Sequence, residues 1–305
     1  MAQDSERMLS HVLSLPHPVI LDGGMSNALE DRGHDLSDAL WSARLLRDAP
    51  GEIAAVHRAY YQVGAAVATT ASYQASVAGF DRAGVPRDEA EGLIASSVSI
   101  ARQVRDDLAV DGRQRWVAAS VGPYGAVLAD GSEYRGRYGV SATALRDFHL
   151  PRLELLRAAG PDLLAVETIP DVDEAEVLVE LLDELNFPAW LSYSIDGTRT
   201  RAGQSLEDAF AVAAQSTSIL AVGINCCAPG DVQAAVEIAL AVTGKPAVAY
   251  PNSGEAWDAT NRRWTGGASD SSALAQGWTT AGARLVGGCC RVGPPDIAAL
   301  AKATR

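Results

Sequence analysis

Leu163-Leu164-Ala165-Val166-Glu167-Thr168 is the clearest strand in the sequence. Its four leading residues are all apolar, and a run without a polar face is typical of a parallel strand covered on both sides. Segments predicted to be helices flank it at about residues 141–159 and 173–185. The strand therefore belongs to a β-then-α unit that ends in polar residues.

The same unit repeats along the chain. Other strands are predicted at residues 18–24, where the strand runs into a loop, and at 66–70, 116–121, 189–194, 220–225, 247–250 and 284–287. Other helices are predicted at about residues 50–63, 87–108, 206–214 and up to 242, and residues 122–138 form a long polar loop. About eight such units without an internal linker predict a closed parallel (β/α)8 barrel, or TIM barrel. An open doubly wound sheet is the alternative. We predict a single domain over residues 1–305, with residues 1–15 as a lead-in segment.

The amino-acid composition limits the classes of molecule that the protein is expected to bind. The chain has 305 residues, 48% of them hydrophobic, so it can bury a large core. Its net charge of −13 argues against nucleic acid and anionic membranes, and suits a cationic or zwitterionic small molecule. The first residues lack a signal-peptide pattern, and no apolar run reaches membrane-spanning length. We expect a cytoplasmic protein with reduced thiols, acting as a monomer or small homo-oligomer.

All four cysteines lie at the ends of two predicted strands, as Cys226-Cys227 and Cys289-Cys290. Neighbouring residues of an extended strand point to opposite faces, so the last two thiols can reach one ion only from an irregular turn, which Gly287-Gly288 permits. A third thiolate from Cys226 or Cys227 would complete a three-sulfur zinc site with an open fourth position. The alternatives are buried apolar cysteine pairs, a disulfide between the strands, or a non-enzymatic protein that stores zinc or senses thiol oxidation.

A barrel would bring these cysteines to other polar residues, because its active site forms where the carboxyl ends of the strands meet. Lysines are absent from these ends, which disfavours imine chemistry, and the five histidines form no ligand-spaced pair. The polar residues expected at this mouth are Asp22, Thr69, Thr70, Glu167, Cys226, Asn252, Cys289 and Cys290.

Seven short motifs occur in the order found in the homocysteine S-methyltransferase family, which this chain resembles from about residue 16 to residue 300. They are Leu21-Asp22-Gly23-Gly24, Thr69-Thr70-Ala71-Ser72-Tyr73-Gln74, Ser120-Val121-Gly122-Pro123-Tyr124-Gly125, Glu167-Thr168-Ile169-Pro170, Gly223-Ile224-Asn225-Cys226, Tyr250-Pro251-Asn252-Ser253-Gly254-Glu255 and Gly287-Gly288-Cys289-Cys290. In particular the chain resembles the stand-alone members that use S-methylmethionine.

The resemblance implies that Cys226, Cys289 and Cys290 bind Zn²⁺, and that the sulfur of homocysteine takes the fourth position. The homocysteine thiolate would then attack the methyl carbon of S-methylmethionine or S-adenosylmethionine, giving methionine. Selenocysteine or another small thiol as acceptor, and a betaine-type donor, are the alternatives. Cys227 follows the predicted ligand, and by strand alternation it should face away from the metal.

Substrate contacts are expected from residues around the metal. The resemblance places Glu167 and Asp22 near the homocysteine ammonium group. Thr70 and the backbone of Gly23-Gly24 are candidates for binding the carboxylate. We expect Asn225 to shape the turn that presents the first cysteine.

A cationic methyl donor favours aromatic faces. Trp41, Tyr73 and Tyr124 are the candidates for this contact, with packing as the competing interpretation. Glu255 and Trp257 follow the seventh strand, where a lid or a donor contact is possible.

Overall fold

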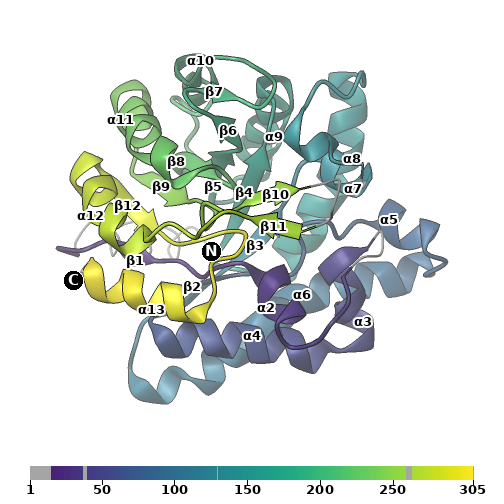
Figure 1. Ribbon diagram of the computed structural model, residues 1–305. Coiled ribbons are helices and arrows are strands. Elements are labelled where there is room, and N and C mark those ends of the chain that lie inside the picture. Colours follow the sequence, from purple (N-terminus) through teal and green to yellow (C-terminus); the bar gives the residue numbers. More distant parts are fainter. Residues whose placement is uncertain (1–14, 37–39, 129, 259–262, 305) are drawn as a thin grey trace.

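Eight parallel strands form the centre of the protein in the computed structural model, which describes residues 15–36, 40–128, 130–258 and 263–304 (Figure 1). They are β1 (Val19–Ile20), β2 (Val67–Thr69), β3 (Trp116–Val121), β4 (Leu163–Ile169), β5 (Ala189–Tyr193), β8 (Ile219–Asn225), β9 (Ala247–Tyr250) and β12 (Ala283–Val286). Each predicted strand is present, most of them within one or two residues of the expected ends. The lead-in segment falls almost wholly outside the described residues.

The strands close into a barrel. Their order is β1-β12-β9-β8-β5-β4-β3-β2, which leaves β1 and β2 at the two ends of the list. A parallel bridge between Leu21 and Val67 joins these ends, and the Asp22 amide donates to the Val67 carbonyl at 3.1 Å. The predicted (β/α)8 barrel is therefore confirmed, and the open doubly wound sheet is wrong.

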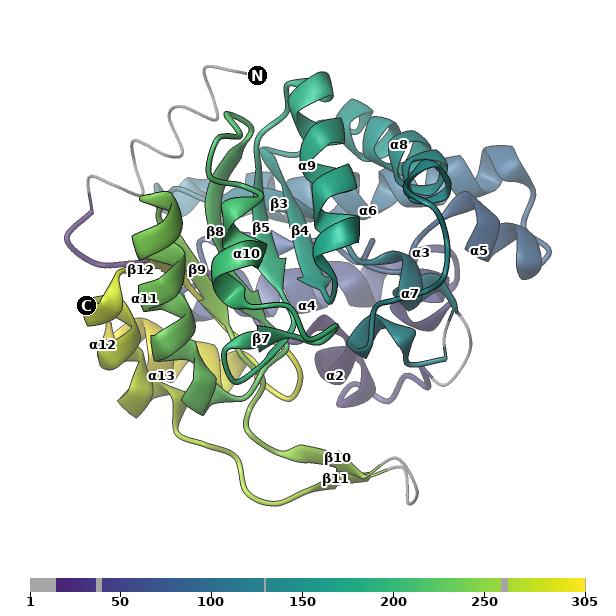
Figure 2. The ribbon, with the colours of Figure 1, turned by 90° about the horizontal axis from the view of Figure 1, so that it is seen from above.

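Helices surround the barrel (Figures 1 and 2). The α-helices are α2 (Met25–Glu30), α3 (Leu45–Asp48), α4 (Pro50–Val63), α5 (Val77–Arg82), α6 (Arg87–Asp107), α7 (Tyr124–Leu128), α8 (Ala142–Ala158), α9 (Val172–Leu185), α10 (Leu206–Ala211), α11 (Val232–Thr243), α12 (Ser271–Ala281) and α13 (Pro294–Ala303). Short 3-10 helices are η1 (Trp41–Arg44), η2 (Ala109–Asp111), η3 (Ser132–Tyr134) and η4 (Pro229–Asp231). No helix in the described part of the chain is long and apolar enough to cross a membrane.

Helix α9 illustrates how the sequence sets these boundaries. The Asp171 side chain accepts a hydrogen bond from the Asp173 amide and caps the first turn, where Glu174 adds a second acidic residue. Asn186 ends the helix in the left-handed conformation that asparagine tolerates. Between these ends the helix buries a continuous apolar face against the barrel.

The predicted loop at residues 122–138 differs from the expectation. It contains two short helical elements, α7 and η3, separated by irregular segments. Elements of five and three residues are too short to show helical periodicity, which explains why the sequence indicated a loop. Helices α5, α12 and α13 and the hairpins β6 (Ile195–Asp196) with β7 (Arg199–Thr200) and β10 (Ala256–Asp258) with β11 (Arg263–Thr265) were also not predicted.

The inside of the barrel is filled by alternate residues of the strands. On β4, Leu163 and Ala165 pack in a central cluster with the fully buried Trp190, whereas Leu164 and Val166 pack in the cluster that includes the helices. Strand alternation then directs Glu167 inward, one layer above this cluster. Since the barrel interior is packed, the site forms at the carboxyl-terminal mouth.

Candidate active site

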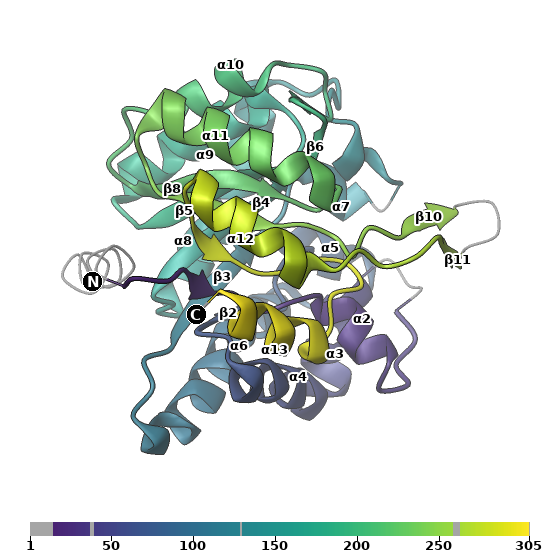
Figure 3. The same cartoon turned by 60° about the vertical axis from the view of Figure 1, so that its left-hand side comes forward.

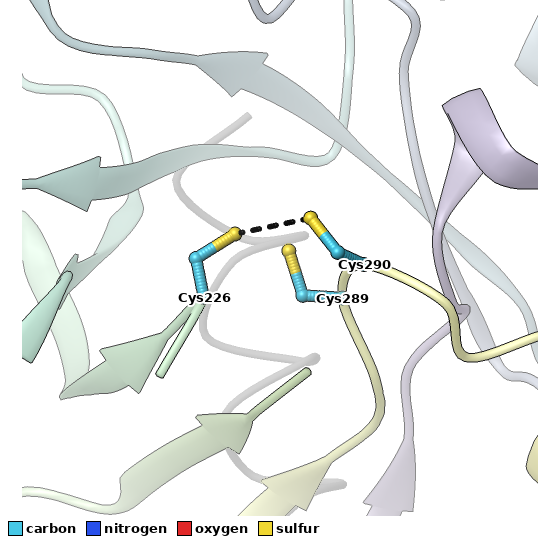
Figure 4. A group of neighbouring side chains, drawn as sticks. All are labelled: Cys226, Cys289 and Cys290. Carbon is cyan, nitrogen blue, oxygen red and sulfur yellow. Dashed lines mark hydrogen bonds between the residues drawn. The ribbon is translucent and has the colours of Figure 1, made fainter. Parts of the chain in front are cut away.

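Three thiols meet at the barrel mouth, from Cys226 after β8 and from Cys289 and Cys290 after β12 (Figure 4). Their sulfur atoms all lie within 4.8 Å of one another, and the Cys226 and Cys290 sulfurs are 3.9 Å apart. Thiolates about 2.3 Å from a tetrahedral zinc ion lie about 3.8 Å from each other. The spacing therefore fits one metal ion held by three sulfurs with a fourth position open. All four cysteines are free, so the predicted alternative of a disulfide between the strands is not what the structure contains.

The turn that carries Cys226 is locked by a buried amide. Cys226 has a positive φ of 47°, and Thr168 at the end of β4 has one of 59°. The Asn225 side chain accepts from the Thr168 amide and donates to its hydroxyl, both at 2.7 Å. It also accepts from the Ser192 hydroxyl on β5 at 2.9 Å. Residues other than glycine seldom adopt the left-handed backbone conformation, and these hydrogen bonds hold Thr168 and Cys226 in it. They support the predicted role of Asn225 in shaping the turn that presents Cys226.

The turn after β12 depends on glycine because of close packing. A Cβ atom on Gly288 would lie 2.1 Å from the Cγ1 atom of Val292, and one on Gly287 would lie 2.6 Å from the Cβ atom of Leu21. Neither glycine has a positive φ. Glycine is therefore required here because there is no room for a Cβ atom, and not because of the backbone conformation. This packing lets Cys289 and Cys290 leave the strand and turn both thiols toward Cys226 (Figure 4).

Asn252, in the loop after β9, connects the two cysteine turns. Its side chain accepts from the Cys290 amide at 3.1 Å, and its own amide donates to the Cys227 carbonyl at 3.0 Å. The neighbouring Pro251 carbonyl accepts from the Cys289 amide at 2.8 Å. The sequence placed Asn252 at the mouth without assigning it this role, since a contact between separate loops leaves no local pattern.

Cys227 takes no part in the three-thiol cluster. Its side chain is 1% exposed and packs with the residues between barrel and helices, as strand alternation predicts. Burial raises the pKa of this thiol well above its ordinary value. In the cluster itself, hydrogen bonds from Cys226 and then Cys289 lower the pKa of Cys290, so the cluster favours one thiolate at Cys290.

Two buried carboxyl groups lie beside the cysteines. Glu167 accepts from the Ser120 hydroxyl and hydrogen-bonds with Tyr250, and burial raises its pKa to about 7. Asp22 accepts from the amide and the hydroxyl of Thr69 at 2.7 and 2.9 Å, and burial raises its pKa to about 8. The charge of Glu167 also raises the pKa of Asp22, and that of Asp22 raises the pKa of Tyr60, while Arg152 lowers the pKa of Glu167 only in part. A bound ammonium group would supply the missing charge.

Thr70 and the Gly23-Gly24 turn serve the protein's own packing. The Thr70 hydroxyl bonds with the Ser72 hydroxyl at 2.7 Å and accepts from the Ser120 amide at 3.1 Å. A Cβ atom on Gly24 would lie 2.6 Å from the carbonyl oxygen of Cys289, and the Gly24 amide donates to Val292. These groups therefore hold the loops around the thiols together, and their predicted binding of a carboxylate stays a prediction.

The predicted aromatic residues divide into two groups. Tyr73 packs its ring on Gly122, hydrogen-bonds with Thr168, and has its pKa raised by burial and then by the charge of Cys226, which places it beside the thiols. The Tyr124 ring packs at 5.4 Å from that of Tyr138 and at 5.1 Å from that of Phe148, in an aromatic cluster along α8. The structure thus brings one of the two tyrosines to the thiols.

The remaining predicted positions are Trp41, Glu255 and Trp257. The Trp41 side chain, like that of Trp257, lies outside the described residues, although both backbones are placed. Glu255 accepts from the Arg291 guanidinium at 3.0 Å and so anchors the base of the β10–β11 hairpin beside the Cys290 turn. The hairpin projects from the barrel (Figure 3).

Three residues near the thiols were missed by the sequence interpretation. Tyr134 is 39% exposed, its pKa is raised first by the charge of Cys226, and Glu133 precedes it. Arg152 on α8 is buried, and its guanidinium donates to carbonyls of the loops after β2 and β3. Burial lowers its pKa to about 10. An aromatic residue in a glycine-rich stretch was the one available signal for Tyr134.

Fold and site together define a (β/α)8-barrel protein with three clustered thiols, spaced as metal ligands are, at its mouth. Residues 19–304 match the sequence profile described as "Homocysteine S-methyltransferase". The homocysteine S-methyltransferase of Escherichia coli strain K12 is 46% identical over 292 residues, covering 92% of this chain and 94% of its own. This chain belongs to the homocysteine S-methyltransferase family.

Solved structures agree with this assignment. The homocysteine methyltransferase MmuM from Escherichia coli in its metallated form superposes with a TM-score of 0.88 and 42% identity, covering 96% of this chain and 99% of that one. Its apo form gives a TM-score of 0.78 with 36% identity, over 95% of this chain and 97% of that one. The arrangement of this chain is thus more similar to the metallated form.

Proposed function

We propose that this protein transfers a methyl group from S-methylmethionine to the thiol of L-homocysteine, giving methionine, with Zn²⁺ held by Cys226, Cys289 and Cys290. The observation that carries the proposal is the set of three sulfurs within 4.8 Å at the mouth of a barrel of this family. A site of this kind leaves room for a fourth sulfur from the substrate.

The donor set favours zinc among the common metals. Thiolates are soft ligands that select zinc and other thiophilic ions over magnesium or calcium. Bound there, zinc would lower the pKa of an incoming thiol so that it is a nucleophilic thiolate at neutral pH. The 3.9 Å between the sulfurs of Cys226 and Cys290 supports a site that fits a cation.

The protein's own residues orient the acceptor. Glu167 and Asp22 are buried at 7% and 4% exposure, and their pKa values are raised first by burial, so ionising either group without a bound cation costs free energy. Pairing one or both with the substrate ammonium would relieve this cost and direct the homocysteine side chain toward the three sulfurs. Asn225 and Asn252 hold the turns from which the thiols project.

The transfer needs no proton from the protein. A bond forms between the homocysteine sulfur and the methyl carbon, and the bond from that carbon to the donor's sulfonium sulfur breaks. The bonding electrons pass to the donor sulfur, so one positive and one negative charge disappear together. Asp22, Glu167 and Cys226 are buried, and a site shielded from water favours such a charge-neutralising step.

The proposal also covers the cellular location of the protein, its binding partners and the alternative substrates. Four free thiols suit a reducing compartment, which supports a cytoplasmic location, and the net charge of −13 disfavours nucleic acid and anionic membranes as partners. S-adenosylmethionine or a betaine-type compound as donor, and selenocysteine or another small thiol as acceptor, are the alternatives within the same chemistry.

Methionine formation from homocysteine and S-methylmethionine tests the proposal. Zinc-loaded protein should form methionine, and removal of the metal by a chelator should stop the reaction, with restoration on adding zinc. Absence of methionine from a sample with verified zinc content would contradict it, and zinc binding without any methyl transfer would point to the storage or sensor alternative. Competing donors and acceptors in the same assay identify the preferred pair.

A further inference from the structure

Glu133 is a third acidic residue near the barrel mouth, besides Asp22 and Glu167. It lies in η3, in the segment that follows β3, and none of the metal ligands comes from this segment. Its Oε2 atom is buried and has no hydrogen-bond partner in the described structure. The other two acidic residues at the mouth differ, since Asp22 is held by Thr69 and Glu167 by Ser120.

The position of Glu133 is fixed by tight packing. A Cβ atom on Gly125 would lie 2.6 Å from the Glu133 nitrogen, so only glycine lets α7 and η3 approach this closely. The Asp130 side chain accepts from the Ser132 amide at 2.9 Å and secures the start of the turn. Glu133 is therefore held where it is by the backbone, not by a partner for its charge.

Glu133 lies on a segment that borders the strands of the barrel, because η3 packs against β4. Its pKa is raised first by burial, and the charges of Asp130 and Cys226 add to the effect, while Glu133 in turn raises the pKa of Tyr73. The pKa of Tyr134, the next residue, is raised most strongly by the charge of Cys226. Glu133, Tyr73 and Tyr134 therefore all interact electrostatically with Cys226 from the segments after β2 and β3.

Arg135 offsets only part of the charge of Glu133. It lies two residues after Glu133, forms an ion pair with Asp130 at 3.7 Å, and lowers the pKa of Glu133 by less than burial raises it. A buried carboxylate oxygen without a donor costs free energy, and the protein keeps it here in a well-packed turn. A positive charge supplied from outside the chain would pair with this oxygen.

We propose that Glu133, together with Tyr73 and Tyr134, binds the positively charged methyl donor. Aromatic faces and a carboxylate are the groups that recognise sulfonium and ammonium ions in partly dry sites. The neutral thioether left after transfer would be held less firmly by the same groups, which assists product release. This inference rests on the proposed function, because it takes the donor to be a sulfonium compound.

The test is steady-state kinetics of zinc-loaded Glu133→Gln, which removes the charge and keeps the shape. We expect the KM for S-methylmethionine to rise about tenfold or more, the loss typical of a charged contact, while the KM for homocysteine and the zinc content stay unchanged. Glu133→Asp should recover part of the donor affinity. Glu154→Gln, an exposed position on α8, makes the same change in net charge and should match the wild type.

The outcomes separate this inference from the proposed function. An active wild type with a donor KM in Glu133→Gln within twofold of its own would overturn the inference and leave the function intact. An equal rise in both KM values would also overturn it, because the residue would then act on the whole site. A zinc-loaded wild type that forms no methionine would instead overturn the proposed function.

Discussion

The barrel mouth has two walls of different construction, the cysteine turns after β8 and β12 and the segment at residues 122–138 after β3. In the first wall, amides and carbonyls beside the thiols are paired through Asn225 and Asn252. In the second, a carboxylate oxygen of Glu133 stays buried without a donor. A metal centre requires geometry fixed to fractions of an ångström, whereas recognition of a charged substrate requires a charge left open for it.

The largest effect should come from the thiols themselves. Cys289→Ala and Cys290→Ala should each reduce metal binding and turnover to background, because two sulfurs cannot hold the ion in the required geometry. Metal analysis and the methionine assay measure this. Cys227→Ala, at the neighbouring buried position outside the cluster, should keep both properties. Full activity in Cys289→Ala would remove the basis for the zinc mechanism.

Two glycine substitutions compare a tightly packed position of the first wall with an open position on a helix. Gly288→Ala places a Cβ atom 2.1 Å from Val292 and should move the cysteine turn, lowering zinc affinity and destabilising the fold by about 1–3 kcal/mol. Metal titration and thermal unfolding measure the two effects. Gly92→Ala on α6, where nothing lies within 4 Å, should instead stabilise by about 0.5–1 kcal/mol. Unaltered zinc affinity in Gly288→Ala would show that the turn tolerates displacement.

Gly125→Ala is the matching change in the second wall. Its Cβ atom would lie 2.6 Å from the Glu133 nitrogen and should displace η3. We expect unchanged zinc content and a raised KM for the methyl donor, measured as for Glu133→Gln. Loss of zinc in this variant would mean that the two walls are not independent.

Asn225→Ala tests how far the first wall depends on one amide. It leaves the Thr168 amide unpaired and frees two residues with positive φ, so stability should fall by about 1–3 kcal/mol. Metal affinity should fall about ten- to a hundredfold, as for other residues that orient ligands. Urea unfolding and competition with a chelator give the two values. Equal affinity in variant and wild type would assign the turn's geometry to Asn252 instead.

The last expected effect concerns the pH dependence of stability and not the metal or the substrates. Folding raises the pKa of Asp22 from 3.8 to about 8, so between these values the folded chain binds a proton that the unfolded chain has released. Stability of the metal-free protein should therefore decrease as pH rises through this window. Asp22→Asn should flatten the decrease, measured as melting temperature against pH, while Asp173→Asn at the exposed start of α9 should not. A slope unchanged by Asp22→Asn would show that this carboxyl group is not protonated in the fold.

Much of this arrangement follows from local sequence. Runs such as residues 163–166 have no polar face, which is typical of strands buried on both sides, and their regular spacing with helices predicts a closed barrel. Barrel topology then brings the strand ends together, so the sequence by itself predicts that the thiols of Cys226, Cys289 and Cys290 meet. The family motifs favoured Cys226 over Cys227, and strand alternation agrees with the buried position that Cys227 occupies.

Other features were decided by tertiary contacts alone. Asn252 joins two turns that are far apart in sequence, Arg152 crosses from a helix to two loops, and Glu133 acquires its unpaired oxygen only through the approach of Gly125. Tyr73 and Tyr124 looked equivalent in the sequence, yet the first lies by the thiols and the second in a cluster along α8. Hydrophobic periodicity encodes which elements form and which face is buried, because those depend on neighbours in the chain. The pairing of individual charges and amides depends on distances between loops, and these exist only after the barrel has closed.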